Sequence, residues 1–257
     1  MNDALDRDRM LEEMGISPRW VLRDPAAVVR SADVGTGVQP LTASALAEPT
    51  PAPEKSNAPE ERASVVEMDW DSLRQSIKSC QSCNLCAGRK QAVPGVGDEN
   101  ASWLFIGEGP GAEEDARGEP FVGQAGKLLD AMLAAVDLRR GEDVYIANAV
   151  KCRPPGNRTP EADELAACFP YLRRQIELIQ PELIVLLGRV AVNSVLGQDA
   201  SLSSLRGKAL SYRTDGREIP VVVTYHPAYL LRNLPDKAKA WEDLCRARAL
   251  MRKLKSR

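Results

Sequence analysis

The sequence predicts an α/β protein of three layers (α/β/α), in which helices cover both faces of a central, mostly parallel sheet. Short apolar runs typical of buried strands alternate with longer segments whose apolar residues recur at helical spacing. Such alternation is typical of βα units. Three of the apolar runs lead into glycine or polar residues, at Gly107, Asn148 and His226. Because ligands bind at the carboxyl ends of parallel strands, we expect these endings to share one pocket, which suggests an enzyme.

Each expected element has its own signal in the sequence. The strands are short apolar runs, which span 103–106, 144–149, 183–187 and 219–225. The helices are expected at 124–136, 161–179, 189–196 and 236–254. The first helix shows a 3.6-residue repeat of leucine, methionine and valine residues. The second is predicted to begin with Thr159 as its N-cap and Pro160 as its first helical residue.

The chain has 257 residues, of which 44% are hydrophobic, and a net charge of −2. This composition is enough for a sizeable core, and the near-neutral charge gives no sign of nucleic-acid binding over the chain as a whole. The basic residues between 246 and 257 are most simply a solvated helix face. No stretch approaches the ~20 apolar residues of a membrane span, and the N-terminus lacks a signal-peptide pattern. We therefore expect a soluble, cytoplasmic protein without a membrane anchor.

Changes in composition predict three regions. Residues 1–33 contain a short amphipathic pattern that is too small to fold alone. Residues 34–66 are rich in Ala, Pro, Ser, Thr and Glu and poor in large apolar side chains, which is typical of a disordered linker. Residues 67–257 carry the alternating strands and helices, and we expect them to form the catalytic domain.

The six cysteines are more typical of metal ligands or buried thiols than of disulfides in a cytosolic chain. Cys80 and Cys83 have the two-residue spacing that lets two thiolates reach one metal centre, and Cys152 lies in a turn after a strand. Cys168 lies about two turns into the helix predicted over 161–179. The spacing alone leaves zinc, an iron–sulfur cluster and ordinary buried thiols open.

Four motifs lie in a fixed order along the chain. They are Gly-Glu-Gly-Pro-Gly at 107–111, Pro-Phe-Val-Gly at 120–123, Asn-Ala-Val-Lys-Cys-Arg-Pro-Pro at 148–155 and His-Pro-Ala-Tyr-Leu-Leu-Arg at 226–232. Together they resemble the motifs of the family 4 uracil-DNA glycosylases, and the resemblance covers roughly residues 75–254. It implies a three-layer α/β/α fold, a [4Fe-4S] cluster and removal of uracil from single- or double-stranded DNA by cleavage of the N-glycosidic bond.

The resemblance also implies the ligands of the cluster. Carried over by position, they are Cys80, Cys83, Cys152 and Cys168. Cys86 falls where the family pattern requires no cysteine, and the sequence leaves open whether it replaces one of these ligands. A cluster held in this way would have a structural role, and the sequence leaves a redox role open without requiring one.

Three residues match positions that bind uracil in the family. Phe121 would stack on the base after it is flipped out of the helix, although its residue type fits an ordinary core position as well. The Asn148 amide matches O4 and N3–H of uracil and not the edge of cytosine, unless the side chain caps its own turn instead. Glu114 corresponds to the residue that crowds C5 of the base and excludes the thymine methyl group. Its acidic neighbours Glu113 and Asp115 leave this alignment open by one position.

The catalytic set implied by the resemblance is His226, Glu108 and Gly109. His226 is the single histidine of the chain and would donate a hydrogen bond to uracil O2, which stabilises the anionic leaving group as an oxyanion hole does. From residue type alone, a lone histidine is more often structural. Glu108 and the Gly109 backbone would shape the water site, and we expect leaving-group stabilisation to outweigh general-base catalysis by Glu108.

The segment after His226 is expected to contact DNA. By resemblance, Leu230 and Leu231 supply an apolar wedge for the gap left by the flipped base, and Arg232 is suited to a phosphate. Without the resemblance, Leu-Leu-Arg fits an ordinary helix start equally well.

Residues 1–33 resemble the N-terminal peptide of the psi subunit of the bacterial replicative clamp loader. The similarity rests on Leu11, on Met14-Gly15-Ile16 and on Trp20. It implies that the linker tethers a monomeric, nucleoid-associated enzyme to the clamp loader. Otherwise, the segment packs on its own domain or stays disordered.

A second function class remains open, in which the same fold and cluster hold DNA or a replication protein with little catalysis. The intact set of Glu108, Phe121, Asn148 and His226 favours the enzyme. An inactive site would have no chemical reason to keep both a base-recognising amide and a leaving-group donor.

Overall fold

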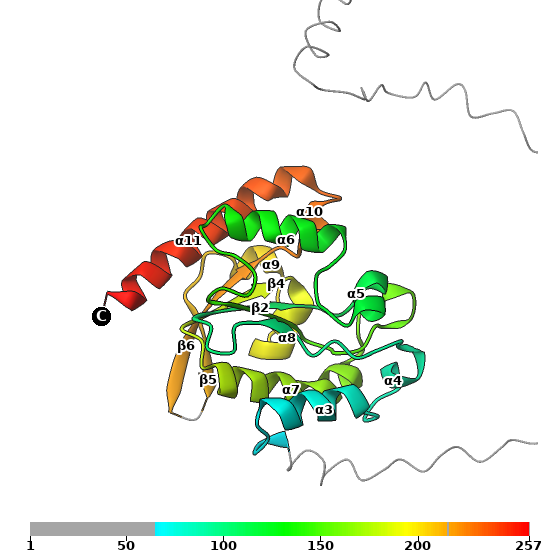
Figure 1. Ribbon diagram of the computed structural model, residues 1–257. Helices are drawn as coiled ribbons and strands as arrows, with labels where there is room; N and C mark the ends of the chain where they lie inside the picture. The colour runs from blue at the N-terminus through cyan, green and yellow to red at the C-terminus, as the bar shows by residue number, and fades with distance from the viewer. Residues whose placement is uncertain (1–64, 215, 257) are drawn as a thin grey trace, which may run out of the picture. The chain divides into compact units, whose positions relative to one another are not determined.

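The computed structural model describes residues 65–214 and 216–256, and within them a mixed six-stranded sheet forms the centre (Figure 1). The strands are β1 (Val96–Gly97), β2 (Trp103–Gly107), β3 (Val144–Asn148), β4 (Leu183–Leu187), β5 (Leu210–Thr214) and β6 (Arg217–Thr224). Their order across the sheet is β1-β3-β2-β4-β6-β5. The four inner strands are parallel, and β1 and β5 pair antiparallel at the two edges. The predicted three-layer fold with a mostly parallel sheet is confirmed.

Helices cover both faces of this sheet. Their bounds are α3 (Trp70–Ser79), α4 (Leu85–Gly88), α5 (Ala112–Arg117), α6 (Gln124–Ala134), α7 (Ala162–Ile179), α8 (Arg189–Leu196), α9 (Leu202–Leu205), α10 (Pro227–Leu230) and α11 (Lys237–Lys255). Two 3-10 turns, η2 (Pro155–Asn157) and η3 (Leu234–Asp236), lie between them. In Figure 1, α6, α10 and α11 lie over one face, and α3, α7 and α8 lie over the other.

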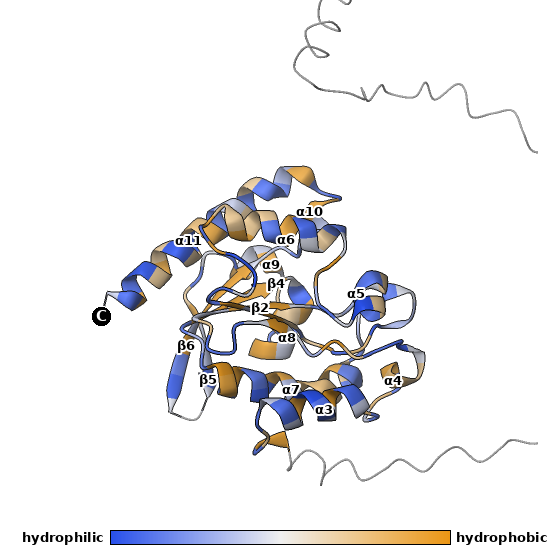
Figure 2. Cartoon of the chain, in the orientation of Figure 1, coloured by the Kyte–Doolittle hydropathy of each residue, from blue (hydrophilic) through white to orange (hydrophobic). Residues whose placement is uncertain are grey.

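Alternate residues of the inner strands feed two hydrophobic cores. Trp103 and Phe105 of β2 belong to the core under α6 and α11, whereas Leu104 and Ile106 belong to the core under α7 and α8. A strand covered on both faces must be apolar at every position, which explains the continuous apolar runs in the sequence. Figure 2 shows this distribution, with hydrophobic residues along the sheet and hydrophilic ones on the outer helix surfaces.

The inner elements lie where the sequence predicts them, because burial on two faces leaves a strong local signal. The strand predicted over 183–187 and the helix over 189–196 match β4 and α8 to the residue. The edge strands β1 and β5 were not predicted. β1 has only two residues, and β5 carries exposed or half-exposed residues at four of its five positions.

The prediction that Thr159 and Pro160 begin a helix is wrong, because α7 begins at Ala162 with Glu161 as its N-cap. The carboxylate of Glu164 accepts a hydrogen bond of 2.8 Å from the Glu161 N–H. A carboxylate at this third helical position satisfies a backbone donor that the start of a helix leaves free.

The N-terminal predictions lie almost entirely outside the described residues. Residues 1–33 and all but the last two residues of the predicted linker 34–66 are not described, so the boundaries of the three regions remain predictions. Within the described ranges, no helix is both long and apolar enough to cross a membrane.

Candidate active site

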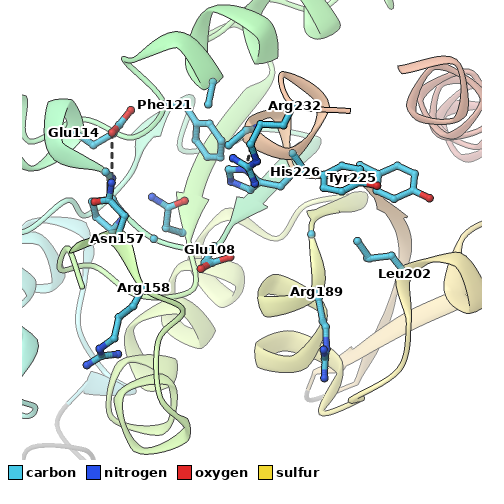
Figure 3. A pocket seen from close by; sticks show the side chains of 18 of the residues that line it. Glu108, Glu114, Phe121, Asn157, Arg158, Arg189, Leu202, Tyr225, His226 and Arg232 are labelled. Carbon is cyan, nitrogen blue, oxygen red and sulfur yellow. Dashed lines mark hydrogen bonds between the residues drawn. The ribbon is translucent and has the colours of Figure 1, made fainter. Parts of the chain in front are cut away.

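A cavity of about 690 Å³ lies at the carboxyl ends of the four parallel strands (Figure 3). Glu108 follows β2, Asn148 ends β3, Gly188 follows β4 and His226 lies after β6. The residues expected from the sequence that line it are Glu108, Gly109, Glu114, Phe121, Asn148, His226 and Arg232. The three strand endings therefore converge as expected, and the end of β4 adds a fourth.

Phe121 lies in a loop that several contacts hold in place. Its φ angle of +55° is unusual for a residue with a side chain and costs roughly 1–2 kcal/mol. Arg140 donates hydrogen bonds of 2.8 Å to the carbonyl oxygens of Pro120 and Phe121. A Cβ atom at Gly126 would lie 1.8 Å from the Phe121 carbonyl oxygen, so α6 needs a glycine to approach this loop. The loop thus keeps the largely buried ring at the cavity wall.

Asn148 presents a buried hydrogen-bond acceptor with no partner in the described part of the chain. The residue is 2% exposed, and its Oδ1 atom accepts no hydrogen bond. A Cβ atom at Gly107 would lie 2.6 Å from this oxygen and 2.5 Å from the Phe121 ring, so the glycine makes room for both side chains. Because an unpaired buried acceptor costs free energy, the site is suited to a ligand that brings a donor.

His226 is oriented as a hydrogen-bond donor. Its Nδ1 atom accepts a hydrogen bond of 3.2 Å from the Ala228 N–H, which assigns the ring proton to Nε2. Burial, and after it the charge of Arg232, lowers the pKa of His226 to about 4. His226 is only partly buried, and it lines the cavity. At neutral pH the side chain is therefore an uncharged N–H donor.

Glu114 joins the two loops on either side of the cavity mouth. Its carboxylate accepts backbone hydrogen bonds from Gly111 at 3.1 Å, from Val122 at 2.9 Å and from Gly123 at 3.0 Å. The loop after β2 and the loop that carries Phe121 are thereby fixed to each other. Glu114 also lines the cavity, and its predicted contact with C5 of a base stays a prediction.

Glu108 and Gly109 lie where β2 meets the segment after β3. The Glu108 carbonyl accepts a hydrogen bond of 3.1 Å from the Val150 N–H, and burial raises the pKa of the Glu108 carboxyl group. A Cβ atom at Gly109 would lie 2.7 Å from Val150, so the two segments approach closely through this glycine. Glu108 also lines a second cavity of about 750 Å³ beside α7 and α8.

The three residues expected to contact DNA have different surroundings. Leu230 is 1% exposed and belongs to the core under α6 and α11, so the expectation that it reaches DNA is not met in this structure. Leu231 is 42% exposed and is the leucine of the pair that faces solvent. Arg232 is exposed and lines the cavity beside His226 (Figure 3). The helical turn of α10 directs successive side chains to different sides, which separates the two leucines.

The four cysteines predicted as ligands lie together in a second part of the molecule. Cys80, Cys83, Cys152 and Cys168 line one small cavity between α3 and α7, and Cys86 does not line it. Cys245 is exposed on α11. The tertiary structure thus gathers the same four thiols that the resemblance implies.

The surroundings of these thiols fit an iron–sulfur cluster. Arg89 Nη1 donates to Cys152 Sγ at 2.8 Å, and the Lys151 backbone N–H donates to Cys168 Sγ at 3.2 Å. No three His, Cys, Asp or Glu side chains among the described residues are arranged around a single-ion site. Four thiols that line one cavity, two of them bound by N–H donors, are a donor set that suits an iron–sulfur cluster.

Comparison with known proteins identifies the family. Residues 94–245 match the family model of the uracil DNA glycosylase superfamily. A type-4 uracil-DNA glycosylase of Archaeoglobus fulgidus is 46% identical over 165 residues, which cover 63% of this chain and 82% of that protein. Another, of Thermotoga maritima, is 43% identical over 184 residues, which cover 70% of this chain and 94% of that protein. The chain belongs to the type-4 uracil-DNA glycosylases.

A more distant similarity extends to the type-5 enzymes. A type-5 uracil-DNA glycosylase of Thermus thermophilus is 34% identical over 160 residues, which cover 50% of this chain and 73% of that protein. The higher identity to the type-4 glycosylases confirms the family that the four sequence motifs indicate.

The cavity of this type-4 uracil-DNA glycosylase contains further residues for which the sequence predicted no individual role. They include Asn157, Arg158, Gly188, Arg189, Leu202, Ser203, Tyr225 and Tyr229. Gly188 and Arg189 directly follow β4, so the rule that located the other strand endings would have found them. Leu202 and Ser203 come from the short helix α9, which carries no local signal for a site.

Proposed function

We propose that this chain flips uracil out of DNA and hydrolyses its N-glycosidic bond, leaving an abasic site for base excision repair. The observation that carries the proposal is the Oδ1 atom of Asn148, which has no hydrogen-bond partner within 65–214 and 216–256. Asn148 lines the same cavity as the neutral donor His226. The relatives named type-4 uracil-DNA glycosylases support the same activity.

Asn148 is proposed to recognise the flipped base. Its Oδ1 accepts the N3–H of uracil and its Nδ2 donates to O4, so that the buried acceptor gains a partner. Cytosine presents an acceptor at N3 and a donor at C4, which would leave both amide atoms facing like groups. Phe121 provides the aromatic surface for stacking, at the same cavity wall.

His226 is proposed to stabilise the leaving group. As the bond between C1′ and N1 breaks, the electron pair moves to the base, and the His226 Nε2–H donates to the developing charge on O2. Water adds to C1′ of the oxocarbenium-like sugar and loses one proton, which balances the negative charge of the released uracil. Glu108 and the Gly109 backbone shape the site of this water. An uncharged histidine is sufficient, because the interaction strengthens as O2 becomes negative.

The DNA around the flipped base is proposed to contact the segment after His226. Leu231 is the exposed leucine suited to fill the gap in the base stack. Arg232 lies at the cavity and is suited to a neighbouring phosphate.

A [4Fe-4S] cluster is proposed to occupy the cysteine cavity, held by Cys80, Cys83, Cys152 and Cys168. When bound, it supplies a structural cross-link between the segment after α3, the turn after β3 and helix α7. The excision of uracil requires no step at the cluster.

The proposed activity is tested with a labelled oligonucleotide that contains one uracil, followed by alkaline cleavage at abasic sites. We expect the iron-loaded chain to cut at uracil, and His226→Ala and Asn148→Ala to cut roughly 100-fold to 1000-fold more slowly. Glu113→Gln, at an exposed carboxylate that lies outside the cavity, serves as the matched control. An iron-loaded wild type that binds this DNA but never cuts it would support the binding module with little catalysis instead.

We also propose that residues 1–33, which the structure does not describe, tether a monomeric cytoplasmic enzyme to the bacterial clamp loader near the nucleoid. The support is the short motif with Leu11, Met14 and Trp20. A pull-down compares the full chain with a chain that begins at residue 34. Equal capture of clamp-loader subunits by both chains excludes the tether.

A further inference from the structure

Lys151 is a buried lysine that the proposed chemistry does not use. It is 2% exposed, and it forms no ion pair with any carboxylate of the described residues. Its Nζ atom donates to the backbone carbonyl of Asn148 at 2.9 Å and to Gln175 Oε1 at 2.5 Å. Burial of an ammonium group without a carboxylate partner is costly, so its place in the structure calls for a function.

Gln175, the second hydrogen-bond partner of the Lys151 ammonium group, is itself held by two hydrogen bonds. Gln175, on α7, is 1% exposed, and its Nε2 atom donates to the Pro94 carbonyl at 2.8 Å and to the Tyr145 hydroxyl at 3.4 Å. The position of the Lys151 ammonium group is therefore set by Gln175 on α7 as well as by the Asn148 carbonyl. The backbone N–H of Lys151 in turn donates to Cys168 Sγ, in the cysteine cavity.

The hydrogen bond from Lys151 Nζ to the Asn148 carbonyl acts on a segment of backbone that is already fixed on its other side. The next two backbone N–H groups, of Ala149 and Val150, donate to the carbonyls of Gly107 and Glu108 and hold the chain to the end of β2. The Asn148 carbonyl is bound by the Lys151 side chain, while the Asn148 side-chain oxygen has no partner among the described residues. The direction of the Asn148 side-chain amide thus depends on the position of the Asn148 backbone, and Lys151 fixes that position through the hydrogen bond to the Asn148 carbonyl.

We propose that Lys151 is a positioning residue that fixes the Asn148 peptide, so that the side-chain amide faces the flipped base, and that links this point to the cysteine cavity. The proposal rests on the proposed excision of uracil and deepens it. A lysine that only stabilised the fold would affect all activities of the protein equally. One that acts through Asn148 affects base recognition and depends on Asn148 being present.

The test is a double-mutant cycle with Lys151→Met, which keeps the side-chain length and removes the donors. We expect kcat/KM for uracil DNA to fall roughly 10-fold to 100-fold, by analogy with the loss seen when the residue that orients a metal ligand is removed. Binding is measured on oligonucleotides that carry uncleavable 2′-fluoro-deoxyuridine or 2′-fluoro-deoxycytidine. The preference for the uracil analogue should fall with kcat/KM. In an Asn148→Ala background, Lys151→Met should lower neither value further.

Lys127→Met, at an exposed lysine on α6, is the matched control and should leave both values unchanged. Iron content and thermal unfolding are measured for every variant. If Lys151→Met does not fold, Gln175→Leu removes the second anchor of the ammonium group and is compared in the same two backgrounds. The proposal is overturned by unchanged kcat/KM and base preference, or by equal fractional losses with and without Asn148. A wild type that fails to excise uracil would instead overturn the proposed function, whereas the binding preference still tests Lys151.

Discussion

The ring of Phe121 lies 5.4 Å from the ring of His226, between centroids, with an angle of 31° between the two planes. Phe121 comes from the loop before α6, and His226 comes from the end of β6. Both line the same cavity. An aromatic surface and a hydrogen-bond donor are thus fixed beside each other, as the binding and release of a planar base require.

Removal of the aromatic surface should weaken excision. We expect Phe121→Ala to lower kcat/KM for uracil DNA by roughly 10-fold to 100-fold, since stacking of a base on an aromatic side chain contributes about 1–3 kcal/mol. Single-turnover kinetics on a uracil oligonucleotide measure the effect. Phe169→Ala, at a half-buried aromatic residue outside the 690 Å³ cavity, is the control. Equal losses in both variants would indicate a general loss of structure instead.

The lowered pKa of His226 predicts how stability depends on pH. Below pH 6.5 the unfolded chain binds a proton at this histidine, while the folded chain resists it until about pH 4. Stability should therefore fall as the pH is lowered from 6.5 toward 4, by up to about 1.4 kcal/mol per pH unit from this group. Urea unfolding of wild type and His226→Gln measures it, and the variant should show the shallower decline. Parallel curves for the two proteins would contradict the prediction.

Glu108 should cost stability at neutral pH, because burial raises its pKa and so disfavours its carboxylate. A raised pKa means that the folded chain holds the proton more tightly, and stability falls as the pH rises past the ordinary range of a glutamate. We expect Glu108→Gln to unfold at a higher temperature than wild type at pH 7.5. Its excision rate should fall less than about 10-fold, far less than that of His226→Ala. A loss as large as that of His226→Ala would establish Glu108 as the general base.

Glu114 should be needed for the geometry of the Phe121 loop. Glu114→Gln replaces a carboxylate that accepts three backbone hydrogen bonds and leaves an amide nitrogen facing N–H donors. We expect a loss of about 1–3 kcal/mol in the free energy of unfolding, together with slower excision. Thermal unfolding and the uracil assay are compared with Glu113→Gln, whose exposed carboxylate lies in the same turn. Normal stability of Glu114→Gln would argue against this structural role.

Loss of one proposed ligand should remove the cluster, while loss of the extra thiol should not. Cys168→Ser is expected to purify with little iron and to unfold at a lower temperature, because Cys168 lines the cysteine cavity. Cys86→Ser is expected to keep its iron, because Cys86 lies outside that cavity. Iron analysis and visible absorption spectra measure both. The reverse pattern would place Cys86 in the ligand set.

Much of the fold and part of the site follow from local sequence. β4 and α8 were predicted to the residue, because strands and helices buried in a core keep their apolar pattern regardless of what they contact. Asn148 and His226 were expected at strand endings for the same reason. The start of α7 was missed because the first turn is capped by Glu164, a residue within the helix, and Thr159 does not act as the N-cap.

Only the tertiary structure decided which neighbouring residues share an environment. Leu230 and Leu231 have the same side chain, yet one is in the core and the other faces solvent. Glu114 is bound by backbone groups eight and nine positions away as well as by its own turn, and the Lys151 ammonium group contacts Gln175 on helix α7. The sequence by itself determined the four inner strands, the polar residues that follow them and the family, because these depend on local pattern and residue type. Hydrogen bonds between distant segments form only when the chain has closed around them, so the fold alone decided how the amide of Asn148, the His226 donor and the four thiols are held.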